Sequence, residues 1–327
     1  MQEGSRRAIV AAFLANLGIA ISKFAGFLIT RSAGMLAESV HSLADTANQA
    51  LLLLGSKRAQ RPADHAHPFG YGPERYFWGF IVALVLFSMG GLFALYEGIE
   101  KLRHPHELTN ATVAFVILGV AIVLEAFSLR TAVREARHVK RPDLGWWDFI
   151  RSSKSPELPV VLLEDTGAQV GLLVAVFGLV MAEITGNPRW DAAGSIAIGV
   201  LLVAIALVLG AEMKGLLIGE AATDADEAAI RAALSSAPGV DSIIHLRTMH
   251  LGPDSLLVVA KIDVDHSFTV EQLARAIDDA ESALRAAVPK AQMVFLEPDI
   301  RRSAGTPATG RPATGIPANG VGATESG

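Results

Sequence analysis

The chain has 327 residues, of which 51% are hydrophobic and 19% are charged, and its formal net charge is -5. The apolar residues form blocks of about 20, which excludes an ordinary soluble enzyme and indicates an integral membrane protein. The sequence contains no cysteine, which excludes disulfides, thiolate zinc sites and thiol redox chemistry, and the mild net charge gives no indication of a nucleic-acid partner.

Six apolar blocks predict six transmembrane helices, at residues 8–29, 33–54, 76–99, 113–129, 160–184 and 192–209. At about 1.5 Å per residue each block can cross a hydrocarbon core of about 30 Å, the fourth and sixth by extending into polar flanks. The first block is too long for a signal peptide and lacks a cleavage signature, so we interpret it as the first span. Lys23 lies near the outer end of this block, and we expect its ammonium to reach the membrane surface.

The distribution of basic residues predicts the orientation, because Lys and Arg favour cytoplasmic loops. The first, third and fifth polar segments hold Arg6, Arg7, Lys57, Arg58, Arg61, Arg134, Arg137, Lys140, Arg141, Arg151 and Lys154. The opposite loops hold Arg31, Lys101, Arg103 and Arg189. We therefore expect a multi-pass protein of the cell membrane with both termini in the cytoplasm.

The sequence changes character after Lys214 and predicts a small soluble α-β-β-α-β domain. Helix starts are expected at Thr223 and at Thr269, the second with the capping-box partner Gln272. Strands are expected at 242–250, 256–264 and 292–296. The predicted domains are a transmembrane domain at 1–214, a cytoplasmic domain at 215–300 and a tail at 301–327. The tail is rich in Thr, Pro, Ala and Gly and is expected to be disordered.

Two ionisable side chains interrupt the second apolar block. His41 and Asp45 are four residues apart, a spacing that places both on one helix face, about 6 Å apart at their β-carbons. A charged group at this depth costs at least about 2.5 kcal/mol and is typical of a functional site. The pair therefore predicts an intramembrane cation site. The alternative interpretation is that the two side chains only hold helices together, through polar neighbours such as Asn16 and Asn48.

Further acids lie in the fourth and fifth blocks. Asp165, preceded by Glu164, sits a few turns inside the fifth block, and Glu125 lies in the fourth. An imidazole with carboxylates is a donor set that suits zinc, which binds nitrogen and oxygen ligands at about 2.0–2.2 Å. Manganese, iron, cobalt, nickel and cadmium remain alternatives. Glu125 could relay protons or form a structural pair.

The loop after the second block reads Pro-Ala-Asp-His-Ala-His-Pro-Phe-Gly-Tyr-Gly at 62–72. Asp64, His65 and His67 in this loop are candidate metal ligands at the cytoplasmic surface. Short clusters of acids and histidines also arise by chance in loops, so we do not base a site on this cluster alone.

The segment 35–72, with His41, Asp45 and this loop, resembles the cation diffusion facilitator family of metal/proton antiporters. The six spans, the α-β-β-α-β domain and the Pro-Gly-Val…Leu-Arg-Thr stretch at 238–248 resemble it too. The resemblance covers about residues 6–299. It implies a homodimer, a transport site built by the second and fifth spans, and a ferredoxin-like regulatory domain.

The chain departs from the family pattern at several ligand positions. The resemblance places a ligand at Asp165, but it places the preceding ligand at Val161, which cannot bind a metal. Glu164 lies one position from Asp165, about 100° around the helix, and either substitutes for the missing ligand or faces elsewhere. In the loop, the resemblance places ligands at Asp64 and His67, but Tyr71 stands where the family pattern has a histidine. In the small domain, the family's metal positions fall on or near Ile244, Lys261, Glu297 and Asp299, which leaves most of that site absent.

The resemblance implies secondary active efflux of divalent cations, most favourably zinc, in exchange for protons. The sequence contains no ATP-binding loop of the Walker type, so ATP-driven transport by this chain is not expected. No resident cofactor and no enzymatic activity are expected. The alternative is a non-transporting membrane sensor or scaffold with a degenerate site. An intramembrane metal hydrolase is disfavoured because the sequence has no His-Glu-x-x-His motif.

Overall fold

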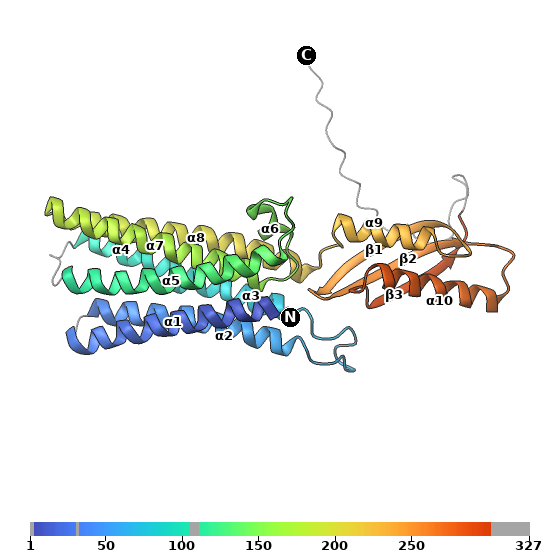
Figure 1. Ribbon diagram of the computed structural model, residues 1–327, viewed down its shortest axis with the longest axis horizontal. Helices are drawn as coiled ribbons and strands as arrows, with labels where there is room; N and C mark the ends of the chain where they lie inside the picture. The colour runs from blue at the N-terminus through green and yellow to red at the C-terminus, as the bar shows by residue number, and fades with distance from the viewer. Residues whose placement is uncertain (1–2, 31–32, 105–110, 302–327) are drawn as a thin grey trace, which may run out of the picture.

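The computed structural model describes residues 3–30, 33–104 and 111–301, in two parts that lie end to end (Figure 1). A bundle of long helices forms one part, and a small α/β domain lies beyond one end of the bundle. The prediction of a helical membrane domain followed by an α/β domain is confirmed. The expected tail lies almost entirely outside the described residues, as do positions 105–110.

The long helices of the bundle run along its axis (Figure 1). They are α1 (Glu3–Thr30), α2 (Ala33–Arg58), α3 (Glu74–Val85), α4 (Phe93–Arg103), α5 (Ala111–Val139), α7 (Glu157–Thr185) and α8 (Arg189–Ile218), and α6 (Trp146–Ser152) is a short helix between α5 and α7. Within the described residues, 4 helical segments are long and apolar enough to cross a membrane, at Glu74–Arg103, Thr112–Val139, Glu157–Thr185 and Arg189–Ile218. The first two of the six expected spans correspond to α1 and α2 and stay predictions.

The outer faces of these helices expose large apolar side chains, among them Val116, Val123 and Phe127 of α5 and Leu207 of α8. So much exposed apolar surface is unfavourable in water and suits contact with lipid. The buried faces carry a core that includes Val82, Val160 and Leu209. The helices of the bundle are therefore apolar both on their outer faces and on their buried faces, as expected for a membrane domain.

The helices α5 and α8 continue beyond the apolar blocks that end at 129 and 209, so the predicted extension into polar flanks is present. One feature of the bundle differs from the sequence prediction. The third span is not a continuous α-helix, because a π-helix at Leu86–Leu92 separates α3 from α4. Within it, a β-carbon on Gly91 would lie 2.5 Å from Val203 Cγ2 of α8, so this glycine permits the close approach of the two helices.

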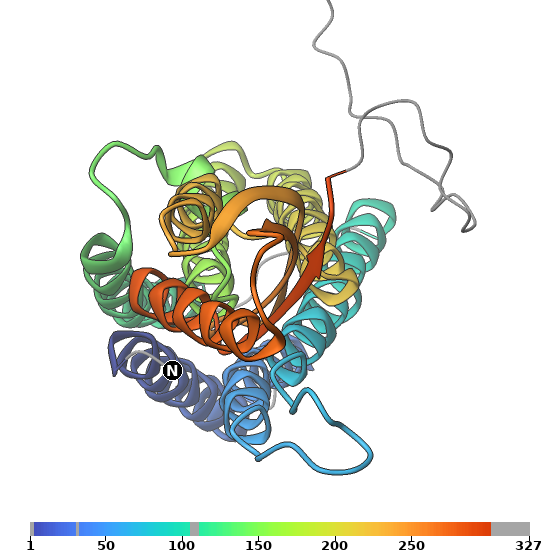
Figure 2. The same cartoon turned by 90° about the vertical axis from the view of Figure 1, so that its right-hand side faces the viewer.

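The small domain has the predicted order of elements. Helix α9 (Asp224–Ser235), strands β1 (Val240–Gly252) and β2 (Ser255–Val264), helix α10 (Val270–Ala287) and strand β3 (Met293–Asp299) follow one another. The 3-stranded sheet has the order β1-β2-β3, antiparallel between β1 and β2 and parallel between β2 and β3. The predicted capping box of Thr269 and Gln272 is present at the start of α10. Figure 2 shows the domain in front of the bundle, viewed along the bundle axis.

Alternate residues of β2 form the core of this domain. Leu256, Val258, Ala260 and Ile262 are fully buried and belong to one apolar cluster with residues of α9 and α10. The period of two is the one expected for a strand that buries one face. The domain thus has an apolar core of its own.

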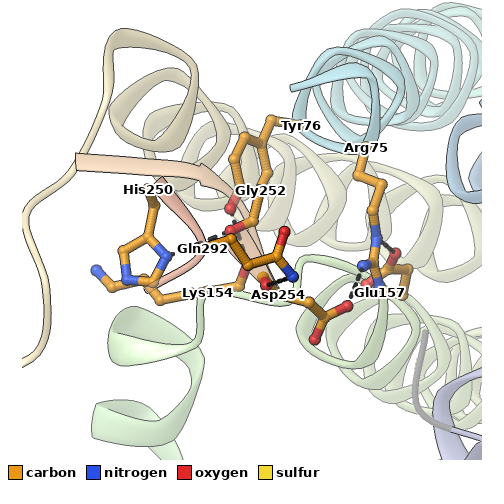
Figure 3. A network of polar contacts seen from close by, with 8 residues as sticks. All are labelled: Arg75, Tyr76, Lys154, Glu157, His250, Gly252, Asp254 and Gln292. Carbon is orange, nitrogen blue, oxygen red and sulfur yellow. Dashed lines mark hydrogen bonds and ion pairs between the residues drawn. The ribbon is translucent and has the colours of Figure 1, made fainter. Parts of the chain in front are cut away.

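A polar network joins the two parts of the molecule (Figure 3). Arg75 of α3 pairs with Glu157 of α7, and its Nη1 also lies 3.2 Å from Oδ2 of Asp254 in the β1–β2 turn. Lys154 pairs with Glu220, whose carbonyl accepts a hydrogen bond from the backbone N–H of His250. Both links cross the junction, so the β1–β2 turn is fixed against the first turn of α7.

Candidate functional site

A cavity of about 350 Å³ lies within the helix bundle. Its lining includes three carboxylates from three different helices: Asp45 of α2, Glu125 of α5 and Glu164 of α7. Long apolar helices bury their polar residues only where these face one another or a cavity. The structure therefore brings Asp45 and Glu164, which the sequence predicts as ligands, to one cavity together with Glu125.

The carboxylate of Glu164 points from α7 toward α2. Its Oε1 accepts a hydrogen bond of 2.9 Å from Asn48 Nδ2, and its Oε2 accepts one of 2.7 Å from Gln49 Nε2. Gln49 in turn accepts a hydrogen bond of 3.3 Å from Asn16 of α1. The sequence interpretation did not single out Gln49, although its position four residues after Asp45 places it on the same helix face. This chain of contacts ties α1, α2 and α7 together.

Asp165 points in another direction, toward α5. Its Oδ2 accepts a hydrogen bond of 2.7 Å from Ser128 Oγ, and the carboxylate is almost fully buried, with 1% of the residue exposed. Val161, at the position where the family pattern has a ligand, lies in the apolar core. The two adjacent acids of α7 therefore accept hydrogen bonds from different helices: Glu164 from α2 and Asp165 from α5.

Glu125 lies close enough to Asp165, Asp45 and Glu164 to interact electrostatically with each of them. It is buried, and Lys23 of α1 is buried near it and lines the same cavity. The expectation that Lys23 extends to the membrane surface is wrong. The acids that surround the cavity give its ammonium a more favourable environment inside the bundle.

His41 lies in α2, but its side chain is outside the described residues. Among the side chains that the structure does describe, no three His, Asp or Glu residues form a ready-made metal cluster. The carboxylates are grouped around a cavity without converging on one point. To bind one divalent cation together, Asp45, Glu164 and Asp165 would have to move toward one another.

The loop at 62–72 is held in shape by its own contacts. Asp64 Oδ2 accepts a hydrogen bond of 2.7 Å from the Tyr71 hydroxyl, and Oδ1 accepts one of 2.7 Å from the backbone N–H of His67. The Tyr71 hydrogen bond, followed by the His67 backbone bond, lowers the pKa of Asp64. The Nδ1 atom of His67 lies 3.5 Å from Asp64 Oδ1. Asp64 and His67 are thus close together, but Tyr71 uses one oxygen that a metal ion would need.

In the small domain, a lysine lies between two carboxylates. Lys261 Nζ is 3.0 Å from Glu297 Oε1 and 3.1 Å from Asp299 Oδ2. The hydrogen bond to Glu297, then the one to Asp299, raises the pKa of Lys261. The acids at these positions therefore have a positive partner from the chain itself.

Long apolar helices around a cavity lined by acids, with an α/β domain at one end, define a polytopic membrane protein. The model of the cation efflux transmembrane domain matches residues 9–218, and that of the cytoplasmic domain of cation efflux proteins matches residues 222–299. The chain therefore belongs to the cation diffusion facilitator family of metal efflux proteins.

Several named relatives are similar to this chain. A mitochondrial proton-coupled zinc antiporter, SLC30A9 of Xenopus laevis, is 32% identical over 80% of this chain and 47% of the relative. Metal tolerance protein C4 of Arabidopsis thaliana is 32% identical over 82% of this chain and 59% of the relative. The metal cation efflux system protein CzcD of Cupriavidus metallidurans is 24% identical over 78% of this chain and 76% of the relative. The chain spans about half the length of the first two relatives.

Proposed function

We propose that this protein is a secondary transporter that moves divalent metal cations, most favourably zinc, out of the cytoplasm in exchange for protons. The observation that carries the proposal is the cavity inside the bundle, onto which α2, α5 and α7 each direct a carboxylate. Buried acids around an internal cavity of a membrane protein are typical of pathways for cations and protons. Two relatives, one named as a proton-coupled zinc antiporter and one as a metal cation efflux system protein, support the same function.

The proposed ligands are His41 and Asp45 of α2 and Asp165 of α7, with Glu164 as an oxygen donor that replaces the one missing at Val161. Only a neutral imidazole and ionised carboxylates bind the metal, so binding releases protons and protonation releases the metal. An imidazole titrates at about 6.5 when unperturbed, which suits exchange driven by modest pH differences. Asp64 and His67 of the loop would attract the cation from the cytoplasm before it enters.

The proposed arrangement has six spans in the cell membrane, with both termini in the cytoplasm and two copies of the chain forming a homodimer. The first turn of α1 lies at the end of the bundle that faces the small domain, and this supports the proposal that both lie on one side of the membrane (Figure 1). The match to the cytoplasmic-domain model supports assigning this side to the cytoplasm. We also propose the domain division at 1–214, 215–300 and 301–327.

The test is zinc flux into proteoliposomes with an imposed pH gradient and simultaneous recording of internal pH. We expect zinc movement coupled to opposite proton movement, and we expect Asp45→Asn to abolish both. Asp148→Asn, outside the bundle core on α6, is a matched control that should transport normally. If folded wild-type protein moves none of zinc, manganese, cobalt, cadmium or iron, the transporter proposal is wrong.

A non-transporting sensor or scaffold is the second candidate. The observation in its favour is that Glu164 is engaged by Asn48 and Gln49, as expected of a group that only holds helices together. This candidate predicts that zinc binds without flux, or not at all, and the same proteoliposomes distinguish the two.

A further inference from the structure

A second group of charges lines the same cavity at the end of the bundle remote from the small domain. Lys101 Nζ of α4 lies 3.1 Å from Glu97 Oε1, 3.1 Å from Asp191 Oδ2 of α8 and 3.4 Å from Ser195 Oγ. The side chain of Lys101 is 38% exposed, so it is only partly hydrated. The ammonium therefore neutralises part of the charge of two carboxylates that lie near each other.

The two carboxylates cannot separate easily, because α4 and α8 pack at close range. A β-carbon on Gly98 would lie 2.8 Å from the backbone nitrogen of Ile196, and one on Gly199 would lie 2.7 Å from that of Leu95. The glycines thus allow the two helices to approach closely beside the charged group. Glu97 and Asp191 stay close together and need a nearby positive charge, whichever cation supplies it.

The position of this group relates it to the proposed transport. Glu97, Lys101 and Asp191 line the cavity that Asp45, Glu125 and Glu164 also line. A cation that moves from the inner carboxylates along this cavity toward the remote end of the bundle passes close to them. Two carboxylates with a hydroxyl nearby are oxygen donors that a divalent cation accepts, so without Lys101 they would hold the departing ion.

We propose that Lys101 is a positioning residue that speeds release of the transported cation by occupying Glu97 and Asp191 with a tethered ammonium. This inference rests on the proposed transport function. The ammonium is attached to the wall of the cavity, so it competes for the carboxylates at a high local concentration that no metal concentration outside the protein changes. The remote end of the cavity therefore keeps an excess of negative charge that attracts a cation. It offers no vacant pair of carboxylates that would hold the cation there.

The first test counts zinc bound to the purified full-length protein in detergent, by equilibrium dialysis. Lys101→Met should bind about one zinc ion more per chain than wild type, because two oxygen donors lose their partner. The additional ion should disappear in the double variant Lys101→Met/Glu97→Gln, and Lys101→Arg should bind as wild type does. Arg103→Met, at the end of the same helix, is the matched control.

The second test measures the kinetics of zinc transport in proteoliposomes. Lys101→Met should lower the maximal rate several-fold and leave the KM for zinc on the cytoplasmic side nearly unchanged. The double variant with Glu97→Gln should recover the rate, which a merely structural role of Lys101 would not allow. Lys101→Gln, checked by size-exclusion chromatography, replaces Lys101→Met if that variant does not fold.

The two proposals can fail separately. If wild type transports and Lys101→Met neither binds additional zinc nor slows release, the role assigned to Lys101 is wrong. An equal loss of rate in the single and double variants also overturns it. If wild type does not transport, the proposed function fails, and the zinc count alone then shows whether Lys101 blocks a cation site.

Discussion

The carboxylates around the cavity of the membrane domain and those of the small domain differ in how closely a lysine of the chain matches them. On β2 and β3, Lys261 lies between Glu297 and Asp299, and the parallel register brings these residues together in the sheet. Around the cavity, Asp45, Glu125 and Glu164 come from three helices and share the cavity with one buried lysine, Lys23, while Glu164 accepts hydrogen bonds from the amides of Asn48 and Gln49. The position of an acid does not make a metal site by itself. What matters is whether the chain already supplies enough positive charge to match its acids.

The largest effect is expected from Asp165→Asn. The amide cannot supply the negative charge that compensates a buried divalent cation, so zinc flux in proteoliposomes should fall to the level of empty liposomes. Ser128→Ala removes only the hydrogen bond of 2.7 Å to Asp165 and should retain measurable flux. Normal transport by a well-folded Asp165→Asn protein would remove Asp165 from the site.

Glu164→Gln distinguishes the two possible roles of this residue, which are to bind zinc and to hold helices together. As a zinc donor, Glu164 should be needed for affinity, and we expect its replacement to weaken zinc binding about tenfold or more in isothermal titration. Gln49→Met removes one donor to Glu164 but keeps the carboxylate, so it should change zinc affinity less. Unchanged zinc affinity together with a lower unfolding temperature of Glu164→Gln would assign Glu164 to helix packing alone.

Lys261→Met tests whether a lysine takes the place of a metal ion between Glu297 and Asp299 of the small domain. Removal of the ammonium should let Glu297 and Asp299 take up zinc weakly, which dialysis would detect as additional bound metal. Lys290→Met is the control, because Lys290 pairs with Asp226 at 2.6 Å and its loss does not free this pair of acids. If Lys261→Met binds no more zinc than Lys290→Met, the lysine does not take the place of a metal ion.

The smallest expected effect concerns pH and His250. Burial lowers the pKa of His250, and Lys154 and Lys290 nearby lower it further, against the Gly252 carbonyl and Asp226, which raise it. Its Nδ1–H donates to Gly252 O at 3.3 Å, whereas Nε2 is buried and has no hydrogen-bond partner among the described residues. The unfolded chain binds a proton at about pH 6.5, where folded His250 does not, so stability should fall as pH drops below this value.

The measurement is the thermal unfolding midpoint of the full-length protein between neutral and mildly acidic pH. The midpoint of His250→Gln should depend less on pH than that of wild type. His245→Gln, an exposed position on the same strand, should keep the wild-type dependence. An identical pH dependence in wild type and His250→Gln would contradict the prediction.

Much of the fold was predictable because its signals are local. The apolar blocks gave the long helices, and Thr269 with Gln272 marked the start of α10, where the capping box is present. The π-helix in the third span was not predictable, because Leu86–Leu92 has the same apolar character as its neighbours. Its geometry depends on packing against α8, which no local pattern encodes.

The sequence predicted which acids belong to the candidate site, but it did not predict which neighbours their side chains face. Spacing placed Asp165 inside the fifth apolar block, but only the fold shows that it faces Ser128, while the adjacent Glu164 faces Asn48 and Gln49. The prediction that Lys23 reaches the membrane surface failed because it assumed that lipid surrounds this side chain. Its actual neighbours are the acids of the cavity. Such neighbours come from distant parts of the sequence.

The π-helix also sets the rotational phase between the two ends of the third span. Arg75 lies on the α3 side of Leu86–Leu92 and Lys101 on the α4 side. A π-helical turn holds about one residue more than an α-helical turn, and each residue turns an α-helix by about 100°. Deleting a single residue here would keep the span apolar and helical, yet Arg75 and Lys101 could then no longer both reach their partners.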